Sequence, residues 1–316
     1  MITLKVRLRP RSPFGTPLAG DTLFGHLCWA LRLRRGEAGL AKLLEGYVSG
    51  QPFAAVSDGF PADFVPRPTV PDWVIGREVD PARRKEEKRR QWLPVALADR
   101  QLARWLDEAV AVPQAQRPRP AVVTRNTINR LTGTTSTGVF APRQSDQLVF
   151  PEGALLDLMA VVDEARFGPD DLGQALQDVG ASGYGRDAST GLGKFEVVSL
   201  EAHRWPAESS TAITLAACAP LPEELHARNC FYLPVTRFGR HGGAAAWTGE
   251  AGPFKRPILM ARTAALLTFR SQGAPAFHGA GLGGEAQPIS GVIPQTVHQG
   301  YAPLVPVLAE LATEDR

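Results

Sequence analysis

Residues 183–195 combine four glycines with side chains that bind phosphate. Glycine lets the main chain take positive φ and approach a ligand closely, while arginine, lysine, serine and threonine donate hydrogen bonds to phosphate oxygens. The candidate residues are Gly183, Gly185, Arg186, Ser189, Thr190, Gly191, Gly193 and Lys194. The pattern predicts a loop that cradles an RNA backbone, with a flexible connection carrying scattered charge as the alternative.

The spacing of this segment excludes two common nucleotide-binding loops. A Walker A loop ending at Gly193 and Lys194 needs glycine at position 188 and serine or threonine at position 195, where this chain has Ala188 and Phe195. A dinucleotide fingerprint beginning at Gly183 also needs glycine at position 188, and it follows a strand rather than the helix expected here. Nucleotide binding of either kind is therefore not indicated.

Two further segments have the composition of RNA-binding loops. The first is rich in arginine and asparagine, which bind phosphates and base edges, and its candidates are Arg125, Asn126, Asn129, Arg130, Thr132 and Gly133. The second is a basic, glycine-containing stretch with the candidates Arg237, Arg240, His241, Lys255 and Arg256. The alternatives are a polar hairpin that satisfies its own turn for the first, and an exposed loop or a protein contact for the second.

Length and composition limit the class of protein. The chain has 316 residues and 44% hydrophobic residues, which favours two domains, and its 31 glycines and 27 prolines predict a strand-rich α+β fold. It contains no uncharged apolar run of about 18 residues, and its N-terminus alternates instead of forming a signal core, so we expect a cytoplasmic protein with no membrane contact. Cys28, Cys218 and Cys230 lack CxxC spacing, so neither a disulfide framework nor a metal site is indicated, and we expect no cofactor.

The charge is distributed unevenly along the chain. The net charge is only +3, but residues 82–130 carry twelve basic and five acidic side chains. A basic segment on a mildly acidic body favours a localised contact with a polyanion, while the alternative is a solvated helix face.

The order of the expected elements favours a two-domain organisation. Within residues 1–205 the pattern predicts strands at 2–8, 53–57, 155–162 and 196–200, helices at 22–33, 38–46 and 169–179, an insertion at 80–120 and a hairpin between 122 and 150. Asp21 is expected to cap the first helix. This order is close to a β-α-β-β-α-β ferredoxin-like unit. Residues 206–316 are expected to be strand-dominated, with strands at 211–218, 232–235 and 258–261 and glycine-rich loops at 239–252 and 279–291.

Four segments in this order resemble a known family, the RAMP superfamily of CRISPR proteins. They are residues 12–25 (SPFGTPLAGDTLFG), 125–134 (RNTINRLTGT), 183–195 (GYGRDASTGLGKF) and 299–306 (QGYAPLVP). The chain is similar in particular to the subunits that cap the 5′ end of the guide RNA in type III-A (Csm-type) effector complexes.

The resemblance implies two ferredoxin-like (RRM-like) domains, at 1–205 and 206–316, with a β-hairpin thumb and the glycine-rich loop. It also implies a non-catalytic role in antiviral defence. Such a subunit binds the 5′ repeat-derived tag of the crRNA and joins the backbone RAMP subunit to the large HD-palm subunit.

Two alternatives remain open at this point. Some RAMP proteins are endoribonucleases that process guide precursors, and such an enzyme needs a general base with a cation or phenol nearby. His26 is the candidate base, with Lys194 and Tyr184 as helpers, although a histidine inside an apolar helix is more typical of packing. The chain has no HExxH or GxSxG motif, so metal hydrolysis and serine catalysis are not indicated. The other alternative is an architectural subunit whose loops contact proteins.

Overall fold

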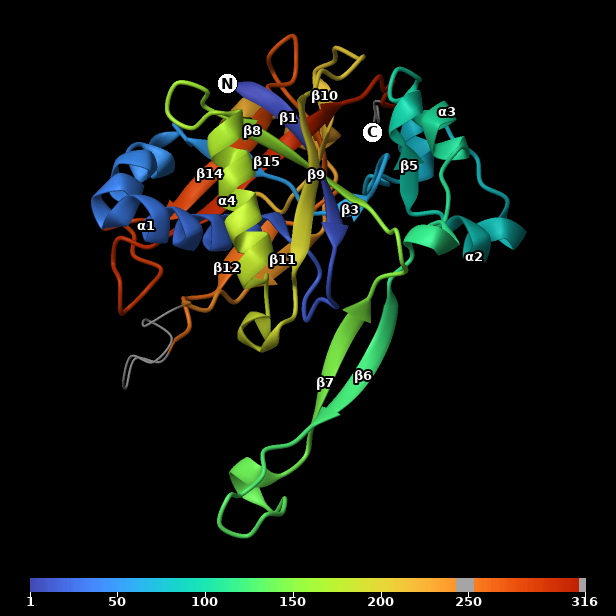
Figure 1. Cartoon of the computed structure of the whole chain (residues 1–316). Helices are drawn as coiled ribbons and strands as arrows, with labels where there is room; N and C mark the ends of the chain where they lie inside the picture. The colour runs from blue at the N-terminus through green and yellow to red at the C-terminus, as the bar shows by residue number, and fades with distance from the viewer. Residues whose placement is uncertain (243–252, 313–316) are drawn as a thin grey trace.

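The computed structural model describes residues 1–242 and 253–312, which form a body built on two antiparallel sheets and a long hairpin that projects from it (Figure 1). The first sheet has the strand order β2-β8-β1-β9, with β3 also paired to β8. Its strands are β1 (Ile2–Pro10), β2 (Ala54–Val56), β3 (Phe60–Pro61), β8 (Leu156–Val162) and β9 (Phe195–Ala202). All neighbours in this sheet run antiparallel, so β1 and β2 run parallel with β8 between them.

Two long helices pack against this sheet. They are α1 (Gly20–Leu44), which follows β1, and α4 (Pro169–Ser182), which follows β8. The leucines of α1 at positions 23, 27 and 31 are buried in the same core as those of α4 at positions 172 and 176. The two helices predicted at 22–33 and 38–46 are one element with a break at Gly36, which has a φ of 74°. Proline at the first position of α4 and a hydrogen bond from the Gly168 N–H to the Asp171 carboxylate start that helix.

The second sheet is formed by the C-terminal third of the chain and has the order β13-β10-β15-β14. Its strands are β10 (Thr211–Thr214), β13 (Leu266–Thr268), β14 (Phe277–Gly283) and β15 (Val297–Pro306), while β11 (Pro234–Arg237) and β12 (Ile258–Ala261) form a separate ribbon. The second ferredoxin-like domain at 206–316 stays a prediction, because the described residues of this part do not show the helices that such a domain needs. Between 203 and 242 and between 253 and 312 the chain has strands and 3₁₀ turns but no α-helix, and that fold needs two.

The glycine-rich stretch at 279–291, expected to be a loop, begins as strand β14. Gly281 lies against the body, where an added Cβ would be 2.4 Å from the carbonyl oxygen of Tyr47. Gly279 pairs with Tyr301 in β15 and has a φ of 117°. These glycines therefore allow strand β14 to pass close to the backbone of other segments, which a residue with a side chain would prevent.

The two sheets are joined by side chains of β15. The Gln299 amide accepts a hydrogen bond from the Val56 N–H at 2.9 Å and donates one to the Val56 carbonyl at 2.8 Å. Tyr301 donates its hydroxyl to the Tyr47 carbonyl at 2.6 Å. Both side chains are buried, so the segment 299–306 that contributed to the family resemblance is part of the core between the sheets. The predicted boundary near residue 206 falls in the connection between β9 and β10.

The insertion at 80–120 packs on the second sheet. It contains α2 (Arg84–Glu87), β5 (Trp92–Pro94) and α3 (Leu102–Asp107), and β5 pairs with β4 (Phe64–Pro66). Trp105 is fully buried, and the Leu102 N–H donates to the Leu308 carbonyl at 2.7 Å. The four residues of α2 are mostly exposed, but Arg77 contacts Glu87 and Asp107 at 2.8 Å each. Part of this charge therefore stabilises the insertion itself.

The hairpin is formed by β6 (Arg119–Arg125) and β7 (Arg143–Val149). It is the element that extends farthest from the body in Figure 1. Within the described ranges, no helix is long and apolar enough to cross a membrane.

Candidate nucleic-acid interface

The glycines of the 183–195 loop are required mainly by the loop's own packing. Gly183, Gly185 and Gly193 all have positive φ. A Cβ added to Gly185 would lie 2.1 Å from the Thr16 hydroxyl oxygen, and one on Gly193 would lie 2.0 Å from the Tyr184 carbonyl. These contacts explain why no larger residue fits. Gly191, also at positive φ, faces open space, so it is the glycine over which a ligand has access.

The loop is fixed to residues 12–19, so two of the segments that resemble the RAMP family lie together. The Gly193 N–H donates to the Pro13 carbonyl at 2.8 Å, and the Lys194 N–H donates to the Ser12 hydroxyl at 2.9 Å. The buried Tyr184 donates its hydroxyl to the Pro17 carbonyl at 2.8 Å. These bonds make the loop a fixed surface rather than a flexible connection.

The predicted donors of the loop lie at its surface. Arg186, Ser189, Thr190 and Lys194 are exposed. Arg186 donates to the Asp146 carbonyl at 2.5 Å, and this carbonyl belongs to β7. The side chains of Ser189 and Lys194 make no hydrogen bond or ion pair with the described residues, so both can reach a phosphate without breaking one.

Arg125, at the end of β6, connects the hairpin to the glycine-rich loop. It donates to the Thr190 hydroxyl at 2.6 Å and lies 3.9 Å from the Asp187 carboxylate. Asp187 takes a left-handed conformation with φ of 62° and accepts a hydrogen bond from Ser145 at 3.1 Å. Sequence reasoning did not assign Asp187 a role, and an Asp in a glycine-rich, turn-forming stretch was the available signal.

The other candidates of the arginine- and asparagine-rich segment at 125–134 lie in the turn at the far end of the hairpin. The Asn129 side chain accepts from the Leu131 N–H at 2.9 Å, and the hydroxyls of Thr132 and Thr134 are 3.1 Å apart. Asn129 and Thr132 therefore make contacts within the turn, and their role in RNA binding stays a prediction. Asn126, Arg130 and Gly133 are exposed in the same turn, where Leu131 is 96% exposed.

In the basic, glycine-containing segment at 237–256, some of the candidate side chains point into the body and others point outward. Arg237 forms two hydrogen bonds of 2.6 Å to the carboxylate of Asp21, and the His241 ring lies 2.7 Å from the Ser290 hydroxyl. Lys255 is partly buried, and burial lowers the pKa of its ammonium group. Arg237 and His241 are thus committed to the body, while Arg240 and Arg256 are exposed.

A polar cluster lies under the start of α1. Helix α1 begins at Gly20 with Ala19 at the capping position, so Asp21 is not the N-cap residue expected from the sequence; its carboxylate accepts from the Thr22 N–H at 2.8 Å, binds Arg237 and lies 3.4 Å from His298. Burial raises the pKa of Asp21, but the nearby His298 ring and the Arg237 guanidinium outweigh it and hold the pKa below its usual range. Burial raises the pKa of Asp58 to about 6, although Thr263 and the Gly20 N–H donate to its carboxylate.

His26 lies beside the glycine-rich loop but is committed to it. Its Nε2 accepts a hydrogen bond from the Gly185 N–H at 2.9 Å, and burial lowers the pKa of the ring. An acceptor nitrogen is unprotonated, so this ring is neutral. It also borders an open groove of about 390 Å³ between α1 and α4, with Trp29 and Leu33 in its wall.

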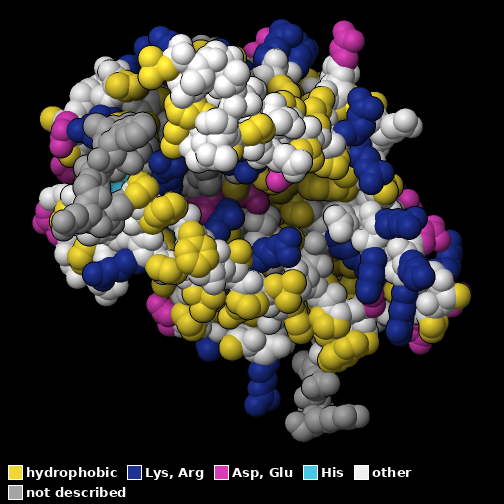
Figure 2. All heavy atoms as spheres, turned by 90° about the horizontal axis from the view of Figure 1, so that it is seen from below, with side chains coloured by type: hydrophobic (Ala, Val, Ile, Leu, Met, Phe, Trp, Pro, Cys, Tyr) yellow, Lys and Arg dark blue, Asp and Glu magenta, His cyan; other side chains and the backbone are white. Residues whose placement is uncertain are grey.

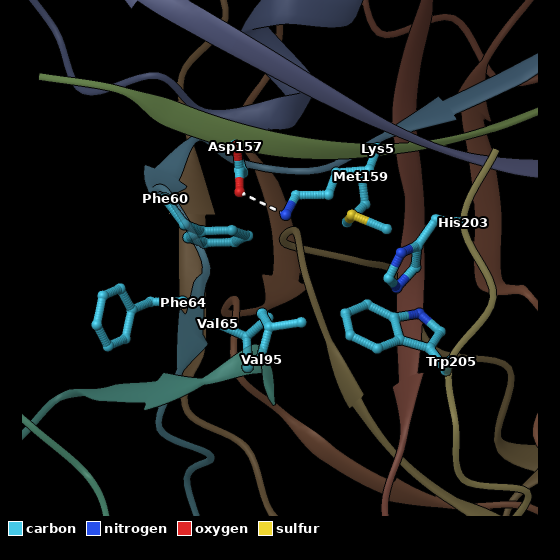
Figure 3. A pocket seen from close by; sticks show the side chains of 9 residues that line it. All are labelled: Lys5, Phe60, Phe64, Val65, Val95, Asp157, Met159, His203 and Trp205. Carbon is cyan, nitrogen blue, oxygen red and sulfur yellow. Dashed lines mark ion pairs between the residues drawn. The ribbon is translucent and has the colours of Figure 1, made fainter. Parts of the chain in front are cut away.

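The small cavity shown in Figure 3 is unsuited to a nucleotide. The cavity is lined by Lys5 and Asp157, whose ammonium nitrogen and carboxylate oxygen are 3.0 Å apart, and by aromatic side chains that include Phe60 and Trp205. Its volume is about 10 Å³, which is room for about one water molecule.

Two solved structures are similar to this chain in fold. A chain of the Csm1–Csm4 cassette in complex with AMPPNP is 16% identical and aligns with a TM-score of 0.59 over 99% of this chain and 100% of that chain. A chain of the Csm3–Csm4 subcomplex in the type III-A CRISPR-Cas interference complex is 11% identical, with a TM-score of 0.53 over 94% of this chain and 99% of that one. The fold is that of Csm-complex subunits. No family model and no curated protein sequence matches the chain.

Proposed function

We propose that this chain is the subunit of a type III-A CRISPR effector complex that binds the 5′ repeat-derived tag of the crRNA. The observation that carries the proposal is the junction of two predicted RNA-binding segments, in which Arg125 of the hairpin contacts Thr190 and Arg186 of the loop contacts β7. The fold supports it, because Csm4 is the protein common to both matched complexes and each match spans nearly the full length of both chains.

The proposal includes the finer fold assignment. The strand order β2-β8-β1-β9, with α1 after the first strand and α4 after the third, supports a ferredoxin-like N-terminal unit. We assign the hairpin of β6 and β7 as the thumb. The hairpin extends outward from the body (Figure 1), and its exposed arginines Arg119, Arg130 and Arg143 suit it to follow an RNA strand outward from the glycine-rich loop.

We also propose that the partners correspond to those in the matched complexes, a large HD-palm subunit like Csm1 and a backbone subunit like Csm3. The salt dependence of assembly separates this role from a purely architectural one. Phosphate contacts give a steep fall in affinity with salt, whereas an apolar protein interface gives a shallow one.

The subunit is proposed to be non-catalytic. The contacts of the candidate base and of one candidate helper disfavour cleavage, since the neutral His26 ring already accepts from Gly185 and the Tyr184 hydroxyl is bonded inside the body. We expect the substitution His26→Gln, which keeps an acceptor, to leave any processing of repeat RNA unchanged. Loss of cleavage in that variant, with the fold intact, would instead favour the endoribonuclease alternative.

The first test is to purify the protein from its native cell at low salt and sequence the 5′ ends of co-purifying RNA. We expect the ends to fall at one fixed offset within a repeated element. Random ends would contradict the tag-binding role. Absence of RNA would also contradict it, because assembly on the tag requires RNA in the purified complex.

The same assay tests the glycine-rich loop. We expect Arg186→Ala with Lys194→Ala to reduce co-purifying RNA, and to make the dependence of log affinity on log salt shallower by roughly 1.4 for two lost phosphate contacts. The matched control removes two exposed basic side chains outside the candidate segments, Lys42→Ala with Arg204→Ala. Equal loss of RNA in both double variants would show a general charge effect and not a site.

A further inference from the structure

The ribbon of β11 and β12 continues beyond its strands as an alternating surface. The Lys255 N–H donates to the Gly239 carbonyl at 2.8 Å, and the His241 N–H donates to the Pro253 carbonyl at 2.8 Å. Along this extension the exposed side chains are Phe238, Arg240, Phe254 and Arg256, whereas the residues between them turn inward. Successive side chains of an extended chain point to opposite faces, so these four share the outer face.

Aromatic and basic side chains face each other across this surface. Arg240 and Phe254 are directly paired on the two chains. Phe238 precedes Arg240 by two residues and Arg256 follows Phe254 by two, so each phenyl ring has a guanidinium group on the opposite chain. Phe238 is 69% exposed and Phe254 is 63% exposed.

The inner face holds the ribbon in place. Arg237 binds the buried Asp21, His241 contacts Ser290, and the Arg256 N–H donates to the Ile289 carbonyl at 2.7 Å. Because these contacts are made without the four outward side chains, the outer face is preorganised and is not needed for the fold. The contact to Asp21 also places the ribbon near Ala19, whose N–H is bonded to Tyr184 of the glycine-rich loop.

The charge of this surface indicates the class of its partner. The described residues 231–242 and 253–262 contain five basic side chains and no acidic one. Figure 2 views the molecule from below, the side from which the hairpin projects in Figure 1, and shows hydrophobic side chains together with lysines and arginines on that side of the molecule as a whole. Exposed aromatic rings among arginines, without carboxylates in residues 231–242 and 253–262, match single-stranded nucleic acid, whose bases stack and whose phosphates pair with guanidinium groups.

We propose that Phe238 and Phe254 stack on two bases of single-stranded RNA, while Arg240 and Arg256 bind the flanking phosphates. This inference rests on the proposed RNA-binding function and adds a base-stacking site outside the hairpin and the glycine-rich loop. The site holds any base, because every base has a face on which phenylalanine stacks.

The test compares two RNAs of about twelve nucleotides, a length within the range that single-strand binding sites cover. One is oligouridylate and the other is an abasic strand with the same phosphates. We measure binding by fluorescence anisotropy with the full chain, and we expect the parent to prefer oligouridylate. Replacing one stacking residue by alanine should weaken oligouridylate binding by about 5- to 140-fold and leave abasic binding unchanged.

Three variants make the outcomes distinct. Phe238→Tyr with Phe254→Tyr keeps both rings and should bind like the parent, whereas Phe238→Ala with Phe254→Ala should lose the preference for bases. Leu259→Ala, which removes an apolar side chain that is 70% exposed on the same ribbon, should have no effect on RNA.

Each contrary result has its own meaning. If the alanine pair binds oligouridylate like the parent while Arg186→Ala with Lys194→Ala does not, the stacking site is refuted and the proposed function stands. If the parent binds neither RNA, both are refuted. Loss of assembly with partner subunits in the alanine pair and in Leu259→Ala, with RNA binding unchanged, would assign the surface to a protein and also refute the proposal.

Discussion

The carboxyl group of Asp58 offers a quantitative test of the polar cluster beneath α1. Its two oxygens accept from the Gly20 N–H at 2.7 Å and from the Thr263 hydroxyl at 2.6 Å. Burial raises its pKa to about 6 from an ordinary value of 3.8. Arg237 and Asp21 are the nearest charges, and they act in opposite directions on this group.

The raised pKa fixes both the sign and the size of the effect on folding. The folded state binds this proton more tightly than the unfolded state, so the stability that the proton provides is fully present below pH 3.8 and is lost as the pH rises through about 6. At about 1.4 kcal/mol for each pH unit between the two values, the loss reaches about 3 kcal/mol. This is an upper limit, because the residue keeps part of its surface at the solvent.

The substitution Asp58→Asn imitates the protonated acid, since one amide oxygen can still accept from the Gly20 N–H and the Thr263 hydroxyl can rotate to accept from the amide nitrogen. We expect the variant to be more stable than the parent at pH 7.5 by up to about 3 kcal/mol. The advantage should disappear near pH 4. The carboxyl of Asp21 does not titrate within this range, because its pKa is held below the usual value.

Urea unfolding of both proteins at half-unit steps between pH 4 and pH 8 measures the difference directly. Subtraction of the two curves removes the other titrating groups. A stability difference that does not vary with pH, or an Asn variant that is less stable than the parent at pH 7.5, would refute the argument that the buried carboxylate is a cost at neutral pH.

Two other substitutions test the packing. Gly193→Ala should be more destabilising than Gly191→Ala by about 1–3 kcal/mol in urea unfolding, because both have positive φ but only the first meets backbone at 2.0 Å; equal effects would contradict the packing argument. Gln299→Ala should cost about 2–4 kcal/mol, because it leaves two buried backbone groups of β2 without partners, and a loss below about 1 kcal/mol would show that water replaces the amide.

The first sheet could be predicted because its sequence pattern is local. Alternation along β1 indicated a half-buried strand and the apolar run of β8 a fully buried one, and the structure has both. The pattern of α4 also gave the right helix. Strand β14 was missed because glycine is rare in strands, and the reason for it here is the Tyr47 carbonyl, which lies more than 200 residues away in sequence.

The role of Arg237 could not be predicted either, because its partner is also distant in sequence. An arginine in a basic, glycine-containing segment is typical of a phosphate donor, and nothing nearby indicates its partner Asp21, which is 216 residues distant. The neighbouring Arg240 has the same local sequence context but faces outward. Which arginine is committed to the fold was therefore decided by strand alternation on a ribbon whose register the sequence alone did not specify.

The difference between basic side chains that are ion-paired within the fold and those that are exposed also decides which part of the chain is available to bind RNA. The sequence placed an excess of charge at residues 82–130, but residues 80–108 carry six acidic side chains against eight basic ones. Several of these are ion-paired within the insertion, including Arg90 with Glu87 and Arg100 with Glu108. Residues 119–149, which form the projecting hairpin, carry in contrast four basic side chains and one acidic one. The hairpin therefore keeps a net positive charge next to the loop that Arg125 contacts, which supports the proposed binding of RNA at this junction.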